Sequence, residues 1–164
     1  MTRITAALAL VCALASPAMG ADLRGVIPDP ELSPGAPPIR DLGIICHQKS
    51  SERRHTTKAE KDAVYRAYGL RSHHDGFCSG LHGCVIDHIT PLTCGGRDVT
   101  ANMFPQKADG AYNQEDKNRL ENLCHKLVCS GQITPAEGQA WFWPDWRKEY
   151  DRRFGAIHGE EAGQ

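Results

Sequence analysis

The stretch of sequence that decides the fold begins CVIDHITPL at residues 84–92. It continues through CGG at 94–96 and NMFPQ at 102–106, and it closes with DKNRLENLCHKLVC at 116–129. The first segment is rich in β-branched residues, glycines mark a turn after it, and a polar segment follows the second extended run. The stretch therefore predicts two short strands followed by a helix.

An adjacent carboxylate and imidazole, Asp87 and His88, end the first extended run. Neighbours on a strand point to opposite faces, but at a strand end bent by Pro91 one can reach a metal while the other reaches a water molecule. Asp87 offers the hard oxygen that Mg²⁺ prefers, and a neutral imidazole can accept a proton near physiological pH. Asn118, in the first turn of the expected helix, is the second metal ligand that this arrangement predicts.

These motifs resemble those of the HNH endonucleases, whose shared core is a ββα-metal finger. The resemblance is closest to an exported subgroup with the approximate pattern DHxxPLxxGG, then NxxPQ, then LExxxHxxVCxG. It is carried by Asp87-His88, Pro91-Leu92, Gly95-Gly96, the segment 102–106 and the segment from Lys117 to Gly131. It implies an α+β fold: a ββα-metal core with additional flanking helices in one small disulfide-stapled domain.

The resemblance also implies a role for each residue of the site. Asp87 is expected to ligate the metal ion and His88 to act as the general base. Asn102 corresponds to the middle Asn of the motif, which shapes the loop and holds the catalytic His in orientation. Asn118 stands where many members carry His, so two alternative metal ligands on the same helix stay open: Glu121 and His125.

Basic residues near the expected site are candidate phosphate contacts, although solvated surface charge accounts for each one equally well. These residues are Arg97, Lys107, Lys117 and Arg119. The formal net charge of −1 is low for a protein that binds nucleic acid without sequence preference. Any basic surface must therefore be local.

Seven cysteines are present, and six remain if Cys12 leaves with a signal peptide. An even number in an exported chain predicts disulfides, and the absence of C-x₂-C pairs disfavours structural zinc. Two of the six stand where the HNH subgroup usually has apolar residues, which implies that Cys94 bonds to Cys124. The pairs that complete this set are Cys46 with Cys129 and Cys78 with Cys84.

Residues 1–20 are predicted to be a signal peptide, because Arg3 precedes an apolar run and a small-residue site ends at Gly20. Residues 21–43 are a Pro-rich arm that either wraps the domain or stays mobile. Residues 44–155 are the nuclease-like domain, and residues 156–164 are a flexible tail. The leader predicts a periplasmic or secreted protein, and its apolar run is too short to span a membrane.

Local signals predict three further helices. Thr57 and Glu60 form a capping box for a helix over 58–68, and Thr134-Pro135 starts another that runs to about Trp143. A last helix follows Asp145. The tryptophans at 141, 143 and 146 are expected to anchor the core, and the histidines at 73, 74 and 82 to lie in a solvated loop rather than to bind metal.

The sequence thus predicts an exported HNH endonuclease that uses one divalent ion, Mg²⁺, and acts on nucleic acid with little sequence preference. We expect DNA rather than RNA as the substrate, a monomer, and no membrane partner. Two alternatives stay open: a secreted binding module that keeps the ββα scaffold without turnover, and a domain structured by zinc.

Overall fold

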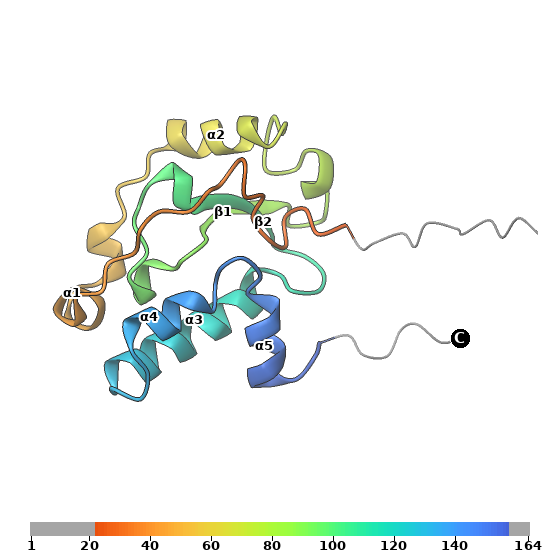
Figure 1. Ribbon diagram of the computed structural model, residues 1–164. Coiled ribbons are helices and arrows are strands. Elements are labelled where there is room, and N and C mark those ends of the chain that lie inside the picture. Colours follow the sequence, from red (N-terminus) through yellow and green to blue (C-terminus); the bar gives the residue numbers. More distant parts are fainter. Residues whose placement is uncertain (1–21, 158–164) are drawn as a thin grey trace, which may run out of the picture.

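Two short antiparallel strands, β1 (Cys84–His88) and β2 (Met103–Lys107), lie at the centre of the structure (Figure 1). In their register Cys84 is opposite Lys107, and His88 is opposite Met103. The computed structural model describes residues 22–157. The expected signal peptide, and residues 158–164 of the expected tail, lie outside the described residues. The two strands and the helices around them form an α+β fold.

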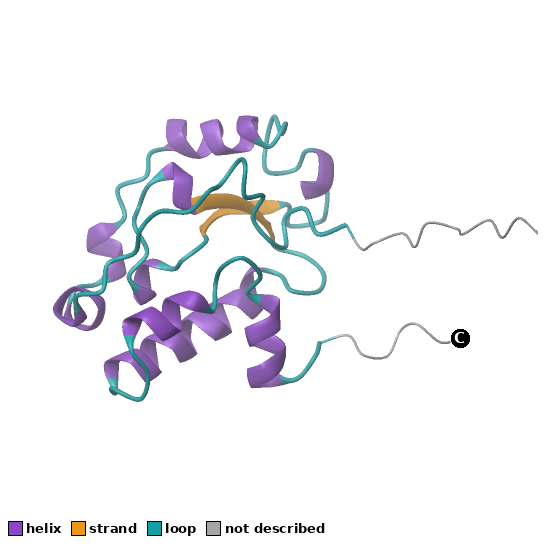
Figure 2. Ribbon diagram, viewed as in Figure 1, coloured by secondary structure: helices purple, strands orange, loops and turns teal. Residues whose placement is uncertain are grey.

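Helices lie on both sides of this hairpin (Figure 2). On one side is α2 (Lys58–Ala67), and on the other are α3 (Gln114–Cys129) and α4 (Pro135–Ala140). Two short helices, α1 (Leu42–His47) and α5 (Arg147–Phe154), pack against α3. Single 3₁₀ turns occur at Ser50–Arg53, Gly76–Cys78, Leu92–Cys94 and Thr100–Asn102.

Capping boxes set the starts of the three central helices. The expected boxes at Thr57 and Thr134 are present at α2 and α4, and a third, formed by Asn113 and Asp116, starts α3. The α4 helix ends at Ala140 rather than near residue 143, because the chain after it turns inward to bury two aromatic side chains. These are Trp141 and Phe142.

The proline-rich arm wraps the hairpin, which resolves one of the two possibilities that its composition allowed. The backbone N–H of Lys107 donates to the carbonyl of Gly25 at 2.8 Å, and the Ser33 hydroxyl donates to the carbonyl of Met103 at 2.5 Å. The arm therefore satisfies polar groups along the edge of β2 that faces away from β1. Covering such an edge prevents it from pairing with another chain.

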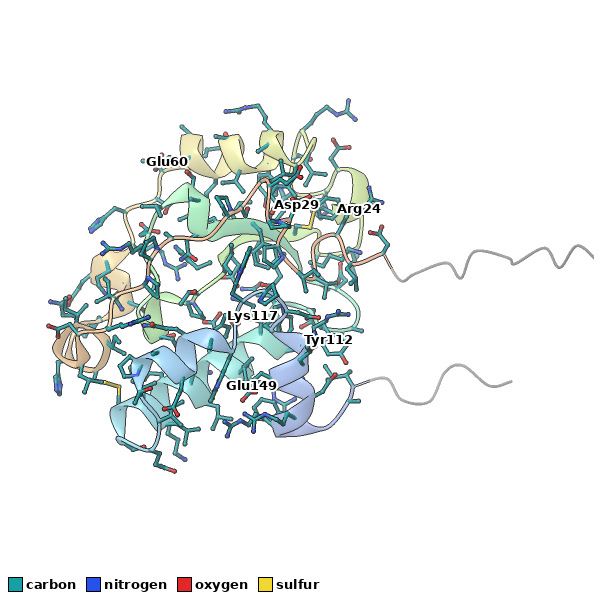
Figure 3. The ribbon with its side chains drawn as sticks, viewed as in Figure 1. Arg24, Asp29, Glu60, Tyr112, Lys117 and Glu149 are labelled. Atoms are coloured by element: carbon teal, nitrogen blue, oxygen red, sulfur yellow. A yellow bond between two sulfur atoms is a disulfide. The ribbon has the colours of Figure 1, made fainter. Side chains whose placement is uncertain are left out.

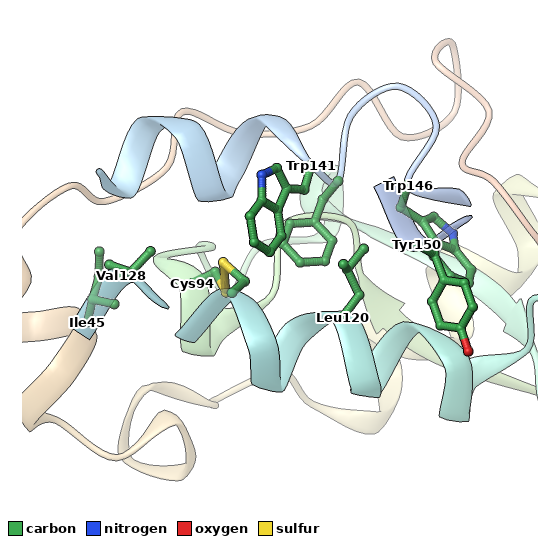
Figure 4. Close-up of a cluster of buried hydrophobic side chains, with 9 residues drawn as sticks. Ile45, Cys94, Leu120, Val128, Trp141, Trp146 and Tyr150 are labelled. Carbon is green, nitrogen blue, oxygen red and sulfur yellow. A yellow bond between two sulfur atoms is a disulfide. The ribbon is translucent and has the colours of Figure 1, made fainter. Parts of the chain in front are cut away.

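Apolar side chains from several elements form the main core (Figure 4). This cluster contains Ile45, Cys94, Leu120, Cys124, Val128, Trp141, Phe142, Trp146 and Tyr150. The indole N–H of Trp146, although buried, donates to the carbonyl of Val26 at 2.8 Å. The expectation that tryptophans anchor the core is confirmed for residues 141 and 146, whereas Trp143 is 38% exposed.

Three disulfides connect the six described cysteines in the expected pairs. Cys46 is joined to Cys129, Cys78 to Cys84, and Cys94 to Cys124, with Cα–Cα distances of 5.6, 5.1 and 6.4 Å. All three distances lie in the range, about 4.4 to 6.8 Å, that a disulfide spans. The first ties α1 to the end of α3, and the third ties the Gly-rich turn to the same helix.

The two disulfides with the most different loop lengths should differ in their contribution to stability. The Cys46–Cys129 bond closes a loop of 83 residues and the Cys78–Cys84 bond a loop of 6. Loop-closure entropy predicts a loss of about 4–5 kcal/mol for the first and about 2 kcal/mol for the second when each pair is changed to serine. Urea denaturation of the two double variants measures this, and equal losses would contradict it.

Candidate functional site

Lys117, a fully buried lysine on α3, is labelled in Figure 3. It joins this helix to the end of β1. Its Nζ donates to Oδ2 of Asp87 at 2.7 Å, to Oε1 of Glu121 at 2.8 Å, and to the backbone oxygen of His88 at 2.7 Å. These acceptors match the three hydrogens of an ammonium group. Two carboxylates, one from the strand and one from the helix, are thus held around one buried cation.

The helical register explains why a lysine is buried at this position. Lys117 lies on the same face of α3 as the buried Leu120, Cys124 and Val128, at spacings of three and four residues. Its Nζ also lies 5.8 Å from the centre of the Phe142 ring, on the segment that covers this face. The ammonium therefore sits between an apolar core and the two carboxylates.

Burial and charge act in opposite directions on this group. Burial by itself would lower the pKa of the Lys117 ammonium, but the Asp87 and Glu121 carboxylates outweigh it and raise the pKa above its ordinary value. Burial raises the pKa of the Glu121 carboxyl, although Lys117 opposes that change. Lys117 therefore remains charged at neutral pH.

A second buried pair lies beyond Asp87 on the same strand. His88 Nε2 is 2.8 Å from Oδ1 of Asp98, and both side chains are 7% exposed. Asp98 lies in the loop between the strands, and its carboxylate also accepts hydrogen bonds from the backbone N–H groups of His55 and Thr56 and from the Thr56 hydroxyl. The loop between the strands is thereby attached to the segment that leads into α2.

The environment keeps the imidazole neutral and the carboxyl ionised at neutral pH. Burial lowers the pKa of His88 below its ordinary value, although Asp98 and Asp87 act in the opposite direction. Burial would raise the pKa of Asp98, but hydrogen bonds from Thr56, His55 and His88 lower it to about 2. His88 therefore has one ring nitrogen able to accept a proton.

The buried Asn102 holds the loop that follows β1. Its Oδ1 accepts from the backbone N–H of Thr90 at 3.0 Å, and its Nδ2 donates to the carbonyls of Thr90 and Arg97 at 3.0 and 2.9 Å. These bonds perform the loop-shaping part of the role that the HNH resemblance implies. The imidazole of His88 is hydrogen-bonded to the carboxylate of Asp98 rather than to Asn102.

A polar cleft opens between α2, β1 and the start of α3. Gln114, Asn118 and Glu121 follow one another at spacings of four and three residues, so they share the face of α3 that lines the cleft. Asp87 lines it from β1, and Arg54 and Lys61 line it from the opposite side. Three sequence-predicted candidates for metal binding are therefore brought together: Asp87, Asn118 and Glu121.

Other predicted residues lie elsewhere. His125 lines a separate cleft, where its Nδ1 is 2.9 Å from the carbonyl oxygen of Thr93. Arg97 Nε donates to the carbonyl of Pro37, and Lys107 lies on β2 beside the arm. Arg119 donates to the hydroxyl of Tyr150 and stacks over Phe154. Neither these three basic residues nor the buried Lys117 is among the residues that line the Asp87 cleft.

The oxygen donors in the cleft suit a hard divalent ion better than a soft one. Among residues 22–157 no group of three His, Cys, Asp or Glu side chains has the geometry of a metal site. Mg²⁺ requires fewer protein ligands, because it is usually held by one or two carboxylates and keeps several waters. Oδ1 of Asp87 accepts no hydrogen bond in the described part of the chain, where Lys117 engages Oδ2 alone.

Reasoning from sequence named Lys117 only as a possible phosphate contact, and it missed Asp98, Arg54 and Lys61. For Lys117 a signal was available. Lys117 occupies a core-facing position in the 117–120–124–128 pattern and lies four residues before Glu121, which predicts a buried ion pair. Asp98 gave no such signal, because a carboxylate in a loop has no periodicity that indicates its partner. Arg54 and Lys61 reach the cleft only through the packing of α2 on the hairpin.

Comparison of the chain with protein-family models, with curated proteins and with solved structures found no match. Within residues 22–157 there is also no helix with the length and apolar character needed to cross a membrane.

Replacing Lys117 by methionine should strongly destabilise the protein, because the two carboxylates would lose their buried counter-ion. We expect a loss of about 3–5 kcal/mol in the free energy of unfolding, measured by urea denaturation. The control is Lys126→Met, an exposed lysine in the last turn of the same helix. Adding Glu121→Leu to Lys117→Met should recover part of the loss. A Lys117→Met variant as stable as the control would contradict the assigned ion cluster.

Proposed function

We propose that this protein is an exported, metal-dependent endonuclease of the HNH type. In this proposal it hydrolyses phosphodiester bonds of nucleic acid, DNA rather than RNA, as a monomer and with little sequence preference. One observation carries the proposal. Carboxylates, the amide of Asn118 and two cationic side chains without ion-pair partners in the described residues line one cleft. His88 is adjacent to Asp87 on the same strand. That combination supplies what phosphodiester hydrolysis needs: an oxygen site for a metal, positive charge for phosphate, and a neutral base.

The donor set supports one hard divalent ion, Mg²⁺ by its chemistry. Asp87 and Asn118 would hold it, and Glu121, which lines the same cleft, is the alternative ligand. Such an ion supplies Lewis-acid stabilisation to the phosphoryl and leaving oxygens. The hydrogen bond from Lys117 Nζ to Oδ2 of Asp87 fixes the position of the Asp87 carboxylate.

His88 is the general base in this proposal. Its imidazole is neutral at physiological pH because burial lowers its pKa, although the nearby carboxylates of Asp98 and Asp87 act in the opposite direction. A neutral imidazole can take a proton from an attacking water molecule. Asn102 supports the loop after His88 without touching the reacting groups.

Phosphate recognition is assigned to Arg54 and Lys61, in place of the four basic residues that the sequence suggested. Both side chains are exposed, both line the cleft, and no hydrogen bond or ion pair engages either side chain within the described residues. Cations of this kind bind the phosphate backbone rather than base edges. Weak sequence preference is the consequence.

Plasmid DNA incubated with the purified protein should be nicked in the presence of Mg²⁺ and remain intact with a chelator. Changing His88 to alanine should lower the rate roughly 10²- to 10⁴-fold, the contribution of a positioned general base. His82→Ala is the matched control, because His82 is an exposed histidine in a loop. Undiminished cleavage by the His88 variant would refute the assigned mechanism.

Binding of DNA should depend on the two cleft cations. In the inactive His88→Ala background, changing Arg54 and Lys61 to glutamine should reduce the slope of log K against log[salt] by about one for each phosphate that the protein no longer binds. Fluorescence anisotropy with a labelled duplex measures this slope. Lys148→Gln is the control, since that exposed lysine lines a different cleft. An unchanged slope in the double variant would exclude these residues as phosphate ligands.

One observation favours the alternative function, a binding module that keeps the scaffold without turnover. The Lys117 ammonium already forms ion pairs with Asp87 and Glu121, as in a structural ion cluster. Isothermal titration of the folded protein with Mg²⁺ distinguishes the two functions. Metal binding that is lost in Asp87→Asn supports the nuclease, whereas DNA binding with neither metal uptake nor cleavage supports the module.

A further inference from the structure

We propose that Asp98 is the positioning residue for His88, and that it holds the imidazole as the Nε2–H tautomer so that Nδ1 is the nitrogen free to accept a proton. This assignment of a residue outside the expected motif deepens the proposed function. The tautomer itself follows from geometry and is independent of whether the protein cleaves nucleic acid.

Both oxygens of Asp98 are occupied by hydrogen-bond donors. Oδ1 lies 2.8 Å from His88 Nε2 and also accepts from the Thr56 hydroxyl, and Oδ2 accepts from the backbone N–H groups of Thr56, at 2.8 Å, and His55. Backbone N–H groups can only donate, so they require a carboxylate that accepts. The ionised Asp98 is therefore an acceptor toward the imidazole as well.

A carboxylate that only accepts determines which ring nitrogen carries the hydrogen. The short contact to Nε2 is favourable only if Nε2 bears the proton, which leaves the lone pair of the neutral imidazole on Nδ1. In the part of the chain that the structure describes, Nδ1 of His88 has no hydrogen-bond partner. The pair is 7% exposed on each side, so competition from water is small.

This tautomer gives Asp98 a defined part in the proposed reaction. One proton of the attacking water passes to Nδ1 while the water oxygen forms the new bond to phosphorus. The bond from phosphorus to the leaving oxygen breaks, and that oxygen takes a proton from solvent. The resulting imidazolium is hydrogen-bonded through Nε2–H to Asp98, which stabilises its charge without touching the substrate.

A second histidine–aspartate pair in the chain resembles His88 and Asp98 but is not buried. His82 Nδ1 lies 2.5 Å from Oδ1 of Asp109, but these side chains are 67% and 31% exposed. His82 lines none of the clefts near Asp87. Asp109→Asn therefore removes a carboxylate from a histidine in the same protein without altering the proposed site.

The test measures the tautomer of His88 directly in ¹⁵N-labelled protein, by long-range ¹H–¹⁵N correlation spectra at pH 7.5. We expect the Nε2–H form in the wild type and a shift toward the Nδ1–H form in Asp98→Asn, whose amide can donate as well as accept. The same variant should lose roughly 10- to 100-fold in kcat on plasmid with little change in KM, part of the contribution of the general base. Asp109→Asn should change neither quantity.

The Thr56→Val variant tests whether the effects of Asp98→Asn arise from a loss of folding. It removes one donor to Asp98 but keeps the carboxylate, so the Nε2–H form should persist. A wild-type His88 in the Nδ1–H form, or an Asp98→Asn variant with unchanged tautomer and kcat, would overturn the proposal. If the wild type shows the Nε2–H form but cleaves nothing, the positioning role stands and the nuclease function is rejected.

Discussion

The attachment of the Lys117 ammonium to the end of β1 is the constraint on which the site depends. A charge that is fully buried must find partners, and here the partners are a strand carboxylate, a helix carboxylate and a strand carbonyl. Sliding α3 along the hairpin would separate the ammonium from at least one of them. The distance between the strand side and the helix side of the cleft is therefore fixed by an ion cluster rather than by apolar packing alone.

The two polar centres of the site lie on opposite faces of one short strand. Side chains alternate along β1, so Asp87 turns toward α3 while His88 turns toward Asp98 and the start of α2. Each centre is completed by a residue outside the strand, Lys117 or Asp98, and the strand holds the two at a constant offset. A strand positions side chains more precisely than a loop does, so the relation between the two centres varies little.

Much of the remaining chain maintains this arrangement. The proline-rich arm covers the open edge of β2, and a disulfide ties the Gly-rich turn after β1 to α3. The formal charge of the chain is −1, yet Arg54 and Lys61 concentrate positive charge beside the cleft. A protein with almost no net charge can attract phosphate when its cations are gathered where the substrate binds.

The sequence by itself determined the local elements, because their signals lie within a few residues of one another. Capping boxes set the starts of α2 and α4, the β-branched run set β1, and an even number of cysteines indicated disulfides. The sequence also identified Asp87 and Asn118, which the fold brings to one cleft. Only the tertiary structure decided that Lys117 is a buried counter-ion, that Asp98 pairs with His88, and that Arg54 and Lys61 face the cleft. The reason is physical: whether a charge is buried, paired or free depends on neighbours that folding brings from distant parts of the chain.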